Sequence, residues 1–227
     1  MGAARIANEL IEGFRALGDL TGTASDVLDQ LGLAGAVPAS LLRPSDAKAR
    51  IVGPALTVLN RARQQSVAEA VATKKSGLGE IQAHRIAQAG DVLVVQGVPN
   101  VSSLGGVSSS IGKRQGEIGA IVDGGARDID HSRAIGYPVW SSSVTPITGK
   151  WRVETAGVNV PVTIAGVAVS PGDLVLADEC GVCFVPAARA AEVLAVARRW
   201  SAWEEERLRK LASGISLDEF TRLPRPQ

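Results

Sequence analysis

An arginine and an aspartate stand next to each other directly after an apolar, glycine-rich run. The segment GAIVDGGARD, residues 119–128, predicts a buried strand, then a Gly-Gly turn, then Arg127 and Asp128 at the carboxyl end of the strand. Ligands bind at such strand ends in open α/β sheets. Arg127 could also be an ordinary surface charge, and Asp128 could cap the helix that follows. Position and spacing alone favour the cap for Asp128.

A second glycine-rich element lies upstream, in the segment LGGVSSSIGKRQG at residues 104–116. The pattern predicts a loop that enters a helix, and the free backbone N–H groups of a helix start can bind a carboxylate or a phosphate. A tight turn that needs glycine is the alternative. The presence of Arg127 beyond the next strand favours the anion site.

Other polar residues with chemical potential receive structural interpretations. Asp123, Asp173 and Asp178 stand at strand ends and glycine turns, where an aspartate commonly accepts backbone N–H groups. His131 follows Asp128 within one helical turn, and a helix-surface position is favoured over a ligand role.

The two cysteines form a Cys-X-X-Cys motif, Cys180 and Cys183. Because the motif lies in a turn between two strand-like runs and not at a helix start, it lacks the setting that activates a redox thiol. Zinc would need further ligands, and only His84 and His131 could add nitrogen. Two small packed side chains in a reducing compartment are the favoured interpretation.

The overall composition excludes several classes of partner. Lys and Arg total 24 against 23 Asp and Glu, so the net charge of +1 predicts neither nucleic-acid binding nor an anionic membrane partner. No apolar run is long enough to span a membrane, and the charges among the first 18 residues argue against a signal peptide. We therefore expect a cytoplasmic protein.

Short apolar runs alternate with segments of helical period, which is typical of an α/β domain. The second half is mostly strands before a long final helix, so a mixed, layered sheet is expected in place of a doubly wound one. No repeat or linker divides the chain, and we expect one domain over residues 1–227 with a loose tail at 223–227. The expected strands are 51–59, 91–96, 118–123, 138–142, 160–169, 174–177 and 182–185, and the expected helices are 3–17, 23–31, 67–74, 81–89, 107–115, 128–135 and 187–212.

The order of these elements resembles the family of the regulator of ribonuclease activity A (RraA) and the 4-hydroxy-4-methyl-2-oxoglutarate aldolases. The resemblance covers nearly the whole chain and implies an α/β fold of the layered β/β/α swivelling type, with a mixed sheet, flanking helices and a long C-terminal helix. The motifs that carry it are TASDVLDQLG (23–32), RIVGPALT (50–57), GDVLVV (90–95), DGGARD (123–128), PGD (171–173), AD (177–178) and GV (181–182).

The resemblance implies a class II pyruvate aldolase that cleaves a small 4-hydroxy-2-oxo acid with Mg²⁺ or Mn²⁺, with oxaloacetate decarboxylation as a second activity. It implies that Arg127 binds the oxo acid and that Asp128 holds the metal, which reverses the preference for the cap. The substrate is held by the loop amides of Gly105, Gly106, Val107 and Ser108. A divalent ion bound by the carboxylate and keto oxygens of the substrate stabilises the developing enolate, and one direct carboxylate ligand is acceptable for Mg²⁺.

The family's site is assembled between subunits of a homotrimer, or of a hexamer made of two trimers. The resemblance implies a carboxylate from a neighbouring subunit, and Glu204 is the best match. A solvated helix with Glu205/Arg209 and Glu206/Lys210 pairs is the equal alternative.

Three observations bear on other mechanisms. No lysine lies inside an apolar strand, which argues against a Schiff-base aldolase, and the glycine motif lies too late in the chain for a methyltransferase. Active members of the family often carry an acid where this chain has Gly106. The resemblance therefore does not identify the residue that transfers protons in this chain. The alternative function is a non-catalytic regulator that binds a ribonuclease, and it does not require Asp128.

Overall fold

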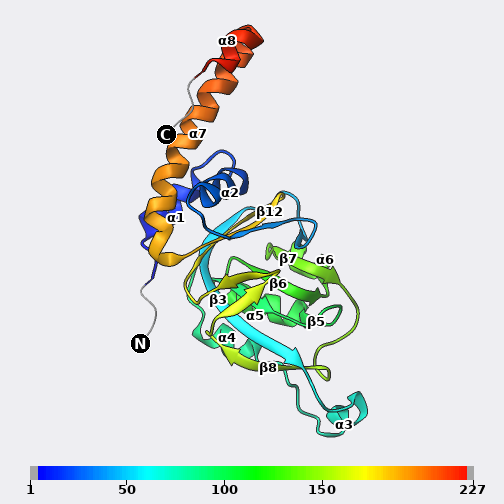
Figure 1. Cartoon of the computed structure of the whole chain (residues 1–227). Helices are drawn as coiled ribbons and strands as arrows, with labels where there is room; N and C mark the ends of the chain where they lie inside the picture. Colours follow the sequence, from blue (N-terminus) through cyan, green and yellow to red (C-terminus); the bar gives the residue numbers. More distant parts are fainter. Residues whose placement is uncertain (1–4, 224–227) are drawn as a thin grey trace.

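The computed structural model describes residues 5–223, and its centre is a mixed sheet (Figure 1). Four parallel strands lie side by side in the order β3, β4, β6, β7, and short β5 pairs in parallel with the end of β6. Parallel pairing places the carboxyl ends of these strands at one edge of the sheet. Their bounds are β3 Ile51–Ala62, β4 Val92–Gln96, β5 Ser102–Leu104, β6 Gly119–Ala126 and β7 Val139–Val144.

Antiparallel strands extend this centre on both sides. The hairpin of β11 and β12 adds to β3 and carries β1, whereas β2 adds to β7 and β8 pairs with the second half of β3. A separate two-stranded sheet, β9 with β10, packs beside them. The bounds are β1 Ala36–Pro38, β2 Arg43–Pro44, β8 Val153–Val158, β9 Val162–Ile164, β10 Val167–Val169, β11 Leu174–Asp178 and β12 Gly181–Val185.

Helices cover the sheet in two groups, each over its own apolar core. Helices α4 and α5 precede parallel strands and α6 links β6 to β7, and their core contains Leu93, Val95 and Val122. Helices α1, α2 and α7 pack over β11 and β12 on a second core, while Trp140 and Ile164 belong to a third between the two sheets. The bounds are α1 Asn8–Arg15, α2 Thr21–Gln30, α3 Val67–Ala72, α4 Glu80–Ile86, α5 Gly106–Gln115, α6 Ile129–Ala134, α7 Ala190–Ala212 and α8 Leu217–Thr221, with a 3₁₀ turn at Ala187–Arg189.

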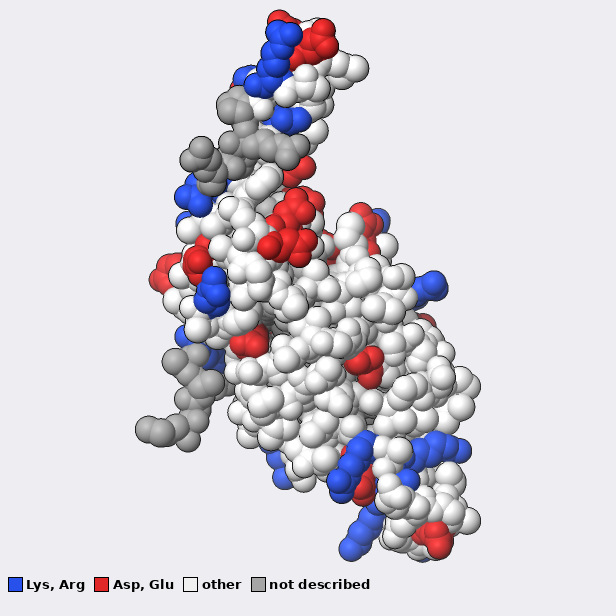
Figure 2. Space-filling view, viewed as in Figure 1, with Lys and Arg blue, Asp and Glu red and all other residues white. Residues whose placement is uncertain are grey.

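Helix α7 is an arm that extends beyond the body of the molecule (Figure 1). Its 23 residues make it about 34 Å long at 1.5 Å per residue. All of its buried residues lie between Ala190 and Ser201, so the second half does not pack into a core. Charged side chains gather along this arm and around α3, and they are sparser over the rest of the face shown in Figure 2.

The predicted fold class is confirmed, because the chain has a mixed sheet, flanking helices and a long C-terminal helix. The single strand predicted at 160–169 is wrong, since a turn at Ala165 and Gly166 divides it into β9 and β10. Strands β1, β2, β5 and β8 were not predicted. Parts of the predicted helix 3–17 and tail 223–227 lie outside the described residues. Within residues 5–223, no helix is long and apolar enough to cross a membrane.

Candidate functional site at the end of strand β6

Arg127 and Asp128 directly follow the last residue of β6, as predicted. The predicted Gly-Gly turn is wrong, because β6 continues through Gly124 and Gly125 to Ala126. The glycines serve close packing: a Cβ on Gly125 would lie 2.8 Å from the backbone of Val101. The Arg-Asp pair therefore lies beside the end of β5, where the Arg127 N–H donates to Leu104 O at 3.0 Å.

The carboxylate of Asp128 binds the start of α5 and not the start of its own helix. Its Oδ2 accepts the Gly106 N–H at 2.8 Å, and the helix that follows Asp128 receives no side-chain cap. The side-chain cap of α6 that position and spacing alone favoured is therefore absent. Asp128 has φ 54° and ψ 39°, a left-handed conformation that aspartate tolerates better than most residues. That backbone conformation points its side chain across to α5.

Arg127 completes a compact charged cluster at this point. Its Nε lies 3.5 Å from Asp128 Oδ2, and the side chains of Arg127 and Asp128 are 43% and 48% exposed, so both reach solvent. A Cβ on Gly105 would lie 3.0 Å from both Arg127 Nε and Asp128 Oδ2. Glycine at position 105 thus lets both side chains lie close to the first turn of α5, and a larger residue would displace them by a few tenths of an ångström.

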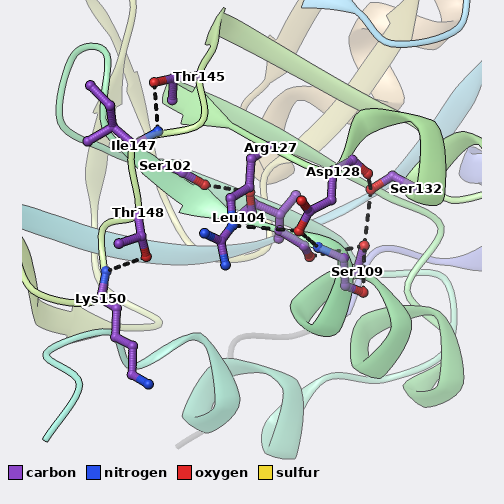
Figure 3. Close-up of polar contacts among 12 residues, drawn as sticks. Ser102, Leu104, Ser109, Arg127, Asp128, Ser132, Thr145, Ile147, Thr148 and Lys150 are labelled. Atoms are coloured by element: carbon purple, nitrogen blue, oxygen red, sulfur yellow. Dashed lines mark hydrogen bonds and ion pairs between the residues drawn. The ribbon is translucent and has the colours of Figure 1, made fainter. Parts of the chain in front are cut away.

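Two buried serines fix the relative position of α5 and α6 (Figure 3). The Ser132 hydroxyl lies 3.0 Å from Ser109 Oγ, and Ser109 Oγ donates to Gly105 O at 3.1 Å. The Ser132 N–H donates to Asp128 O at 3.1 Å. Both serine side chains are inaccessible to solvent. The backbone of Asp128 is therefore held against the glycine loop by protein groups that need no ligand.

Two open depressions meet at Asp128. One, of about 640 Å³, is lined by Gly106, Val107, Ile111 and Asp128, and the other, of about 490 Å³, by Arg127, Asp128, Val144 and Thr145. Val107 and Val144 are 77% and 71% exposed, among the most exposed large apolar side chains of the described residues. One exposed valine therefore lines each of the two depressions beside Asp128.

The site fits a hard divalent ion better than zinc. In residues 5–223 no group of three His, Cys, Asp or Glu side chains could share a metal, whereas zinc sites need three or four such ligands. Mg²⁺ keeps several waters and uses one or two carboxylates. Asp128 Oδ2 is engaged by Gly106, and Oδ1 has no protein partner in the described part of the chain. Asp128 is thus the residue that would hold the ion.

First-turn amides of α5 are the other binding groups available here. The four N–H groups at a helix start lack intrahelical acceptors. Gly106 N–H is bonded by Asp128, whereas the amides of Val107 and Ser108 have no acceptor within the described chain. An incoming carboxylate could bind these two amides next to Arg127.

Glu204 does not join this cluster within one chain. It is exposed on the second half of α7, and this helix extends beyond the body that contains α5 and α6 (Figure 1). The predicted pair of Glu206 with Lys210 is present at 3.7 Å, but Arg209 binds Glu206 at 2.8 Å and not Glu205. Arg209 is three residues from Glu206, and this spacing also brings side chains together on a helix.

The remaining acids act on turns, as predicted. Asp123 accepts the Ala165 N–H of the β9–β10 turn at 2.7 Å, Asp173 accepts from Ser170, and Asp178 accepts from Thr21 and Cys180. His131 lies on the surface of α6, where its Nε2 is 2.8 Å from Ser110 Oγ.

The two cysteines are free and differ in environment. Cys183 is buried in β12, as predicted, and burial raises the pKa of its thiol to about 12. Cys180 is exposed in the β11–β12 turn, so the prediction that both side chains are packed is wrong for this residue. A two-residue turn leaves its outward side chain no neighbouring layer.

A buried polar group behind the glycine loop escaped the sequence analysis. His84 of α4 contacts both Glu117 and Ser108, and Tyr137 contacts Glu117. His84 was considered only as a zinc ligand. The available signal was the rarity of histidine, since the chain has only two.

The chain is similar in sequence to a known protein family and to several known proteins. A family model described as "RraA-like: Aldolase/RraA" matches residues 21–184. Protein DlpA of Legionella pneumophila is 29% identical over 198 residues, which is 86% of this chain but only 31% of DlpA. A Halalkalibacterium halodurans protein named "Putative 4-hydroxy-4-methyl-2-oxoglutarate aldolase" is 30% identical over 178 residues, 78% of this chain and 79% of that protein.

A solved structure shares the fold over almost the whole chain. It is Streptomyces coelicolor RraAS2, described as an unusual member of the RNase ES inhibitor RraA protein family. The two chains are 29% identical with a TM-score of 0.73, and the match covers 94% of this chain and 100% of RraAS2.

Proposed function

Because this chain belongs to the RraA-like family, we propose that it is a Mg²⁺- or Mn²⁺-dependent aldolase that cleaves a small 4-hydroxy-2-oxo acid to release pyruvate, with oxaloacetate decarboxylation as a second activity. The observation that carries the proposal is the Arg127–Asp128 pair, held against the first turn of α5 by the Asp128–Gly106 bond of 2.8 Å. A regulator that only binds another protein has no need of this charged pair.

The residues divide the work in a way that follows from their chemistry. The planar guanidinium of Arg127 can donate two parallel bonds to the carboxylate of an oxo acid. The loop of Gly105, Gly106, Val107 and Ser108 offers backbone amides to the same anion, and Asp128 would hold the ion. When bound, the divalent ion would supply positive charge to the substrate's carboxylate and keto oxygens as the C3–C4 bond breaks.

A homotrimer, or a hexamer of two trimers, completes the proposal. The exposed Val107 and Val144 beside the site would be covered by a neighbouring subunit, and Glu204 on that subunit's arm would supply a second carboxylate. A site shared in this way explains why Glu204 is remote from Asp128 within one chain.

The test measures pyruvate release from 4-hydroxy-4-methyl-2-oxoglutarate and from oxaloacetate, with Mg²⁺, with Mn²⁺ and with a chelator. We expect activity only with metal, and a loss of at least about 100-fold in Asp128→Asn, because removing a direct ligand costs several kcal/mol of transition-state stabilisation. Asp26→Asn is the matched control, since it removes an exposed carboxylate from α2, which packs over β11 and β12 and not beside Asp128. Metal-independent release, or full activity in Asp128→Asn, contradicts the proposal.

Mixing two inactive variants tests the shared site. In a 1:1 mixture of Asp128→Asn and Glu204→Gln subunits, about a quarter of the intersubunit sites combine an intact Asp128 with an intact Glu204. After subunit exchange we expect about a quarter of wild-type activity. A mixture that stays inactive contradicts the shared site, and light scattering gives the number of subunits.

A second candidate function is inhibition of a ribonuclease by surface binding. Two observations favour it: the similarity to RraAS2, and Gly106 at a position where active relatives often carry an acid. Capture of an RNA-degrading enzyme, together with the absence of Mg²⁺ binding by calorimetry, would support this function over the aldolase.

A further inference from the structure

Four side chains form a continuous hydrogen-bonded chain that ends at the glycine loop. Tyr137 OH donates to Glu117 Oε2 at 2.7 Å, Glu117 Oε1 lies 2.7 Å from His84 Nδ1, and His84 Nε2 lies 2.8 Å from Ser108 Oγ. The four residues come from different segments: α4, the first turn of α5, and the loops before β6 and before β7. Only the fold brings them together.

The chain is enclosed by the protein at every point except Ser108. The side chains of His84 and Glu117 are both 0% exposed, and Tyr137 is fully buried. Gly112 of α5 makes the space: a Cβ there would lie 2.4 Å from Glu117 Oε2 and 3.0 Å from Tyr137 OH. A buried carboxylate and imidazole rarely stabilise a fold better than apolar residues of similar size. Their presence beside the candidate site therefore points to a chemical role.

The contacts fit one direction of donation along the chain, from Tyr137 and His84 to Glu117 and from Ser108 to His84. Burial, and the charge of Glu117 beside it, raise the pKa of Tyr137 well above its usual value, so the phenol keeps its proton and donates it to Glu117. An ionised Glu117 can also accept the Nδ1–H of His84. With Nδ1–H directed at Glu117, the lone pair of His84 would lie on Nε2 and would accept the hydroxyl proton of Ser108. This is the arrangement by which a histidine, oriented by a carboxylate, activates a serine hydroxyl.

We propose that Ser108 exchanges protons with the substrate, and that His84 and Glu117 position Ser108 and store the proton. The inference rests on the proposed aldolase function and supplies the proton relay that Gly106, which has no side chain, cannot provide. Ser108 is partly exposed at the start of α5, two residues after the amide that binds Asp128. It is the catalytic residue of the relay, and His84, Glu117 and Tyr137 are positioning residues.

The step balances within the chain and the substrate. The C4 hydroxyl of the substrate gives its proton to Ser108 Oγ while the Ser108 proton moves to His84 Nε2. The C3–C4 bond breaks, C4 becomes a carbonyl carbon, and the electron pair of the bond enters the pyruvate enolate. C3 then takes a proton from Ser108, which recovers one from His84. The transient imidazolium faces two carboxylates, Glu117 in contact and Glu80 one turn earlier on α4.

Two substrates separate this relay from a general effect on the site. Cleavage of a 4-hydroxy-2-oxo acid requires removal of the C4 hydroxyl proton, whereas oxaloacetate loses CO₂ without any proton being removed. In Ser108→Ala and Glu117→Gln we expect cleavage to fall about 100-fold, the usual worth of a general base. Oxaloacetate decarboxylation should fall less than about threefold in the same variants, because its C–C bond breaks without a base and its enolate can take the C3 proton from water.

Ser110→Ala is the matched control, because its hydroxyl bonds a surface histidine, His131, at the same 2.8 Å distance. It should leave both reactions unchanged, and Ser108→Thr should restore part of the cleavage lost in Ser108→Ala. Equal losses on both substrates, or no loss on either, overturn the relay alone. A wild-type chain that releases no pyruvate with metal overturns the proposed aldolase and the role of Ser108 together.

Nitrogen NMR of the imidazole rings gives a measure that does not depend on activity. The chain has two histidines, so His131→Asn leaves the signal of His84 alone. We expect neutral His84 to carry its proton on Nδ1, and Glu117→Gln to remove that preference. A proton on Nε2 would mean that His84 donates to Ser108, and the proposed direction of transfer would be wrong.

Discussion

Asp128 combines a functional side chain with an unfavourable backbone conformation, so its substitutions should separate the two contributions to stability. At φ 54° and ψ 39°, the backbone conformation of most residues other than glycine destabilises the folded state by about 1–2 kcal/mol. This destabilisation is smaller for aspartate and asparagine, because they tolerate the left-handed region. For an alanine at this position the full conformational destabilisation applies.

The side chain adds a second contribution through its bond to Gly106 N at 2.8 Å. For a half-exposed carboxylate at a helix start, this bond and the helix dipole together contribute about 1 kcal/mol. Asp128→Ala loses the bond and adds the backbone strain, so its free energy of unfolding should fall by about 2 kcal/mol in all. Asp128→Gly also loses the bond but relieves the backbone, and the flexibility of the unfolded glycine chain offsets part of that relief. We expect a loss of about 1 kcal/mol for glycine and about 0.5 kcal/mol for asparagine, which keeps a weaker bond.

Urea unfolding at pH 7, without divalent metal and at one protein concentration, measures these differences. The expected order of stability is wild type, Asn, Gly, Ala, while all three variants lose metal-dependent activity. If Asp128→Ala unfolds at the same urea concentration as Asp128→Gly, or at a higher one, with an unchanged slope, the backbone argument is refuted. Metal-dependent activity retained in any of the three would refute the ligand role of Asp128.

Two further predictions concern buried titratable groups. Burial raises the pKa of Glu80 above its usual 4.5, so the native state binds the proton more tightly than the unfolded state. The free energy of unfolding therefore falls as the pH rises from 4.5 through the raised native pKa. Glu80→Gln should therefore be more stable than wild type in urea at pH 7, with the difference vanishing below pH 4.5; equal stability at pH 7 would be contrary to this reasoning. For the thiols, a disulfide reagent at pH 8 should modify Cys180 alone in the native protein, because Cys183 is buried with a pKa of about 12, and both after unfolding. Rapid modification of both thiols in the native protein would show that β12 opens.

The sequence predicted the parts of the fold that depend on apolar runs. Strand β4 and the first half of β6 are buried on both faces, so their residues form apolar runs that a pattern reveals. The missed strands lack this signal. Strand β5 is only three residues long and contains two serines, while β1 and β2 are short edge strands that contain Pro38 and Pro44. Tertiary pairing alone makes these segments strands.

The site was predictable where position along the chain decides it. The rule that ligands meet the carboxyl ends of parallel strands places Arg127 and Asp128 correctly. The partner of the Asp128 carboxylate was not predictable, because the helix it binds begins 22 residues earlier in the chain. The Glu117–His84 contact was missed for a similar reason, since two buried polar residues 33 positions apart leave no periodic pattern.

The arm α7 also carries two of the four tryptophans of the chain. Trp200 and Trp203 lie 5.4 Å apart with their rings nearly perpendicular, at 83°, whereas Trp140 is buried in the core. Two indoles this close couple optically, so circular dichroism should report on the geometry of the arm. Their fluorescence should shift to shorter wavelength when another subunit covers the helix. In the proposed homotrimer or hexamer, Trp200 and Trp203 would therefore serve as an intrinsic probe of assembly.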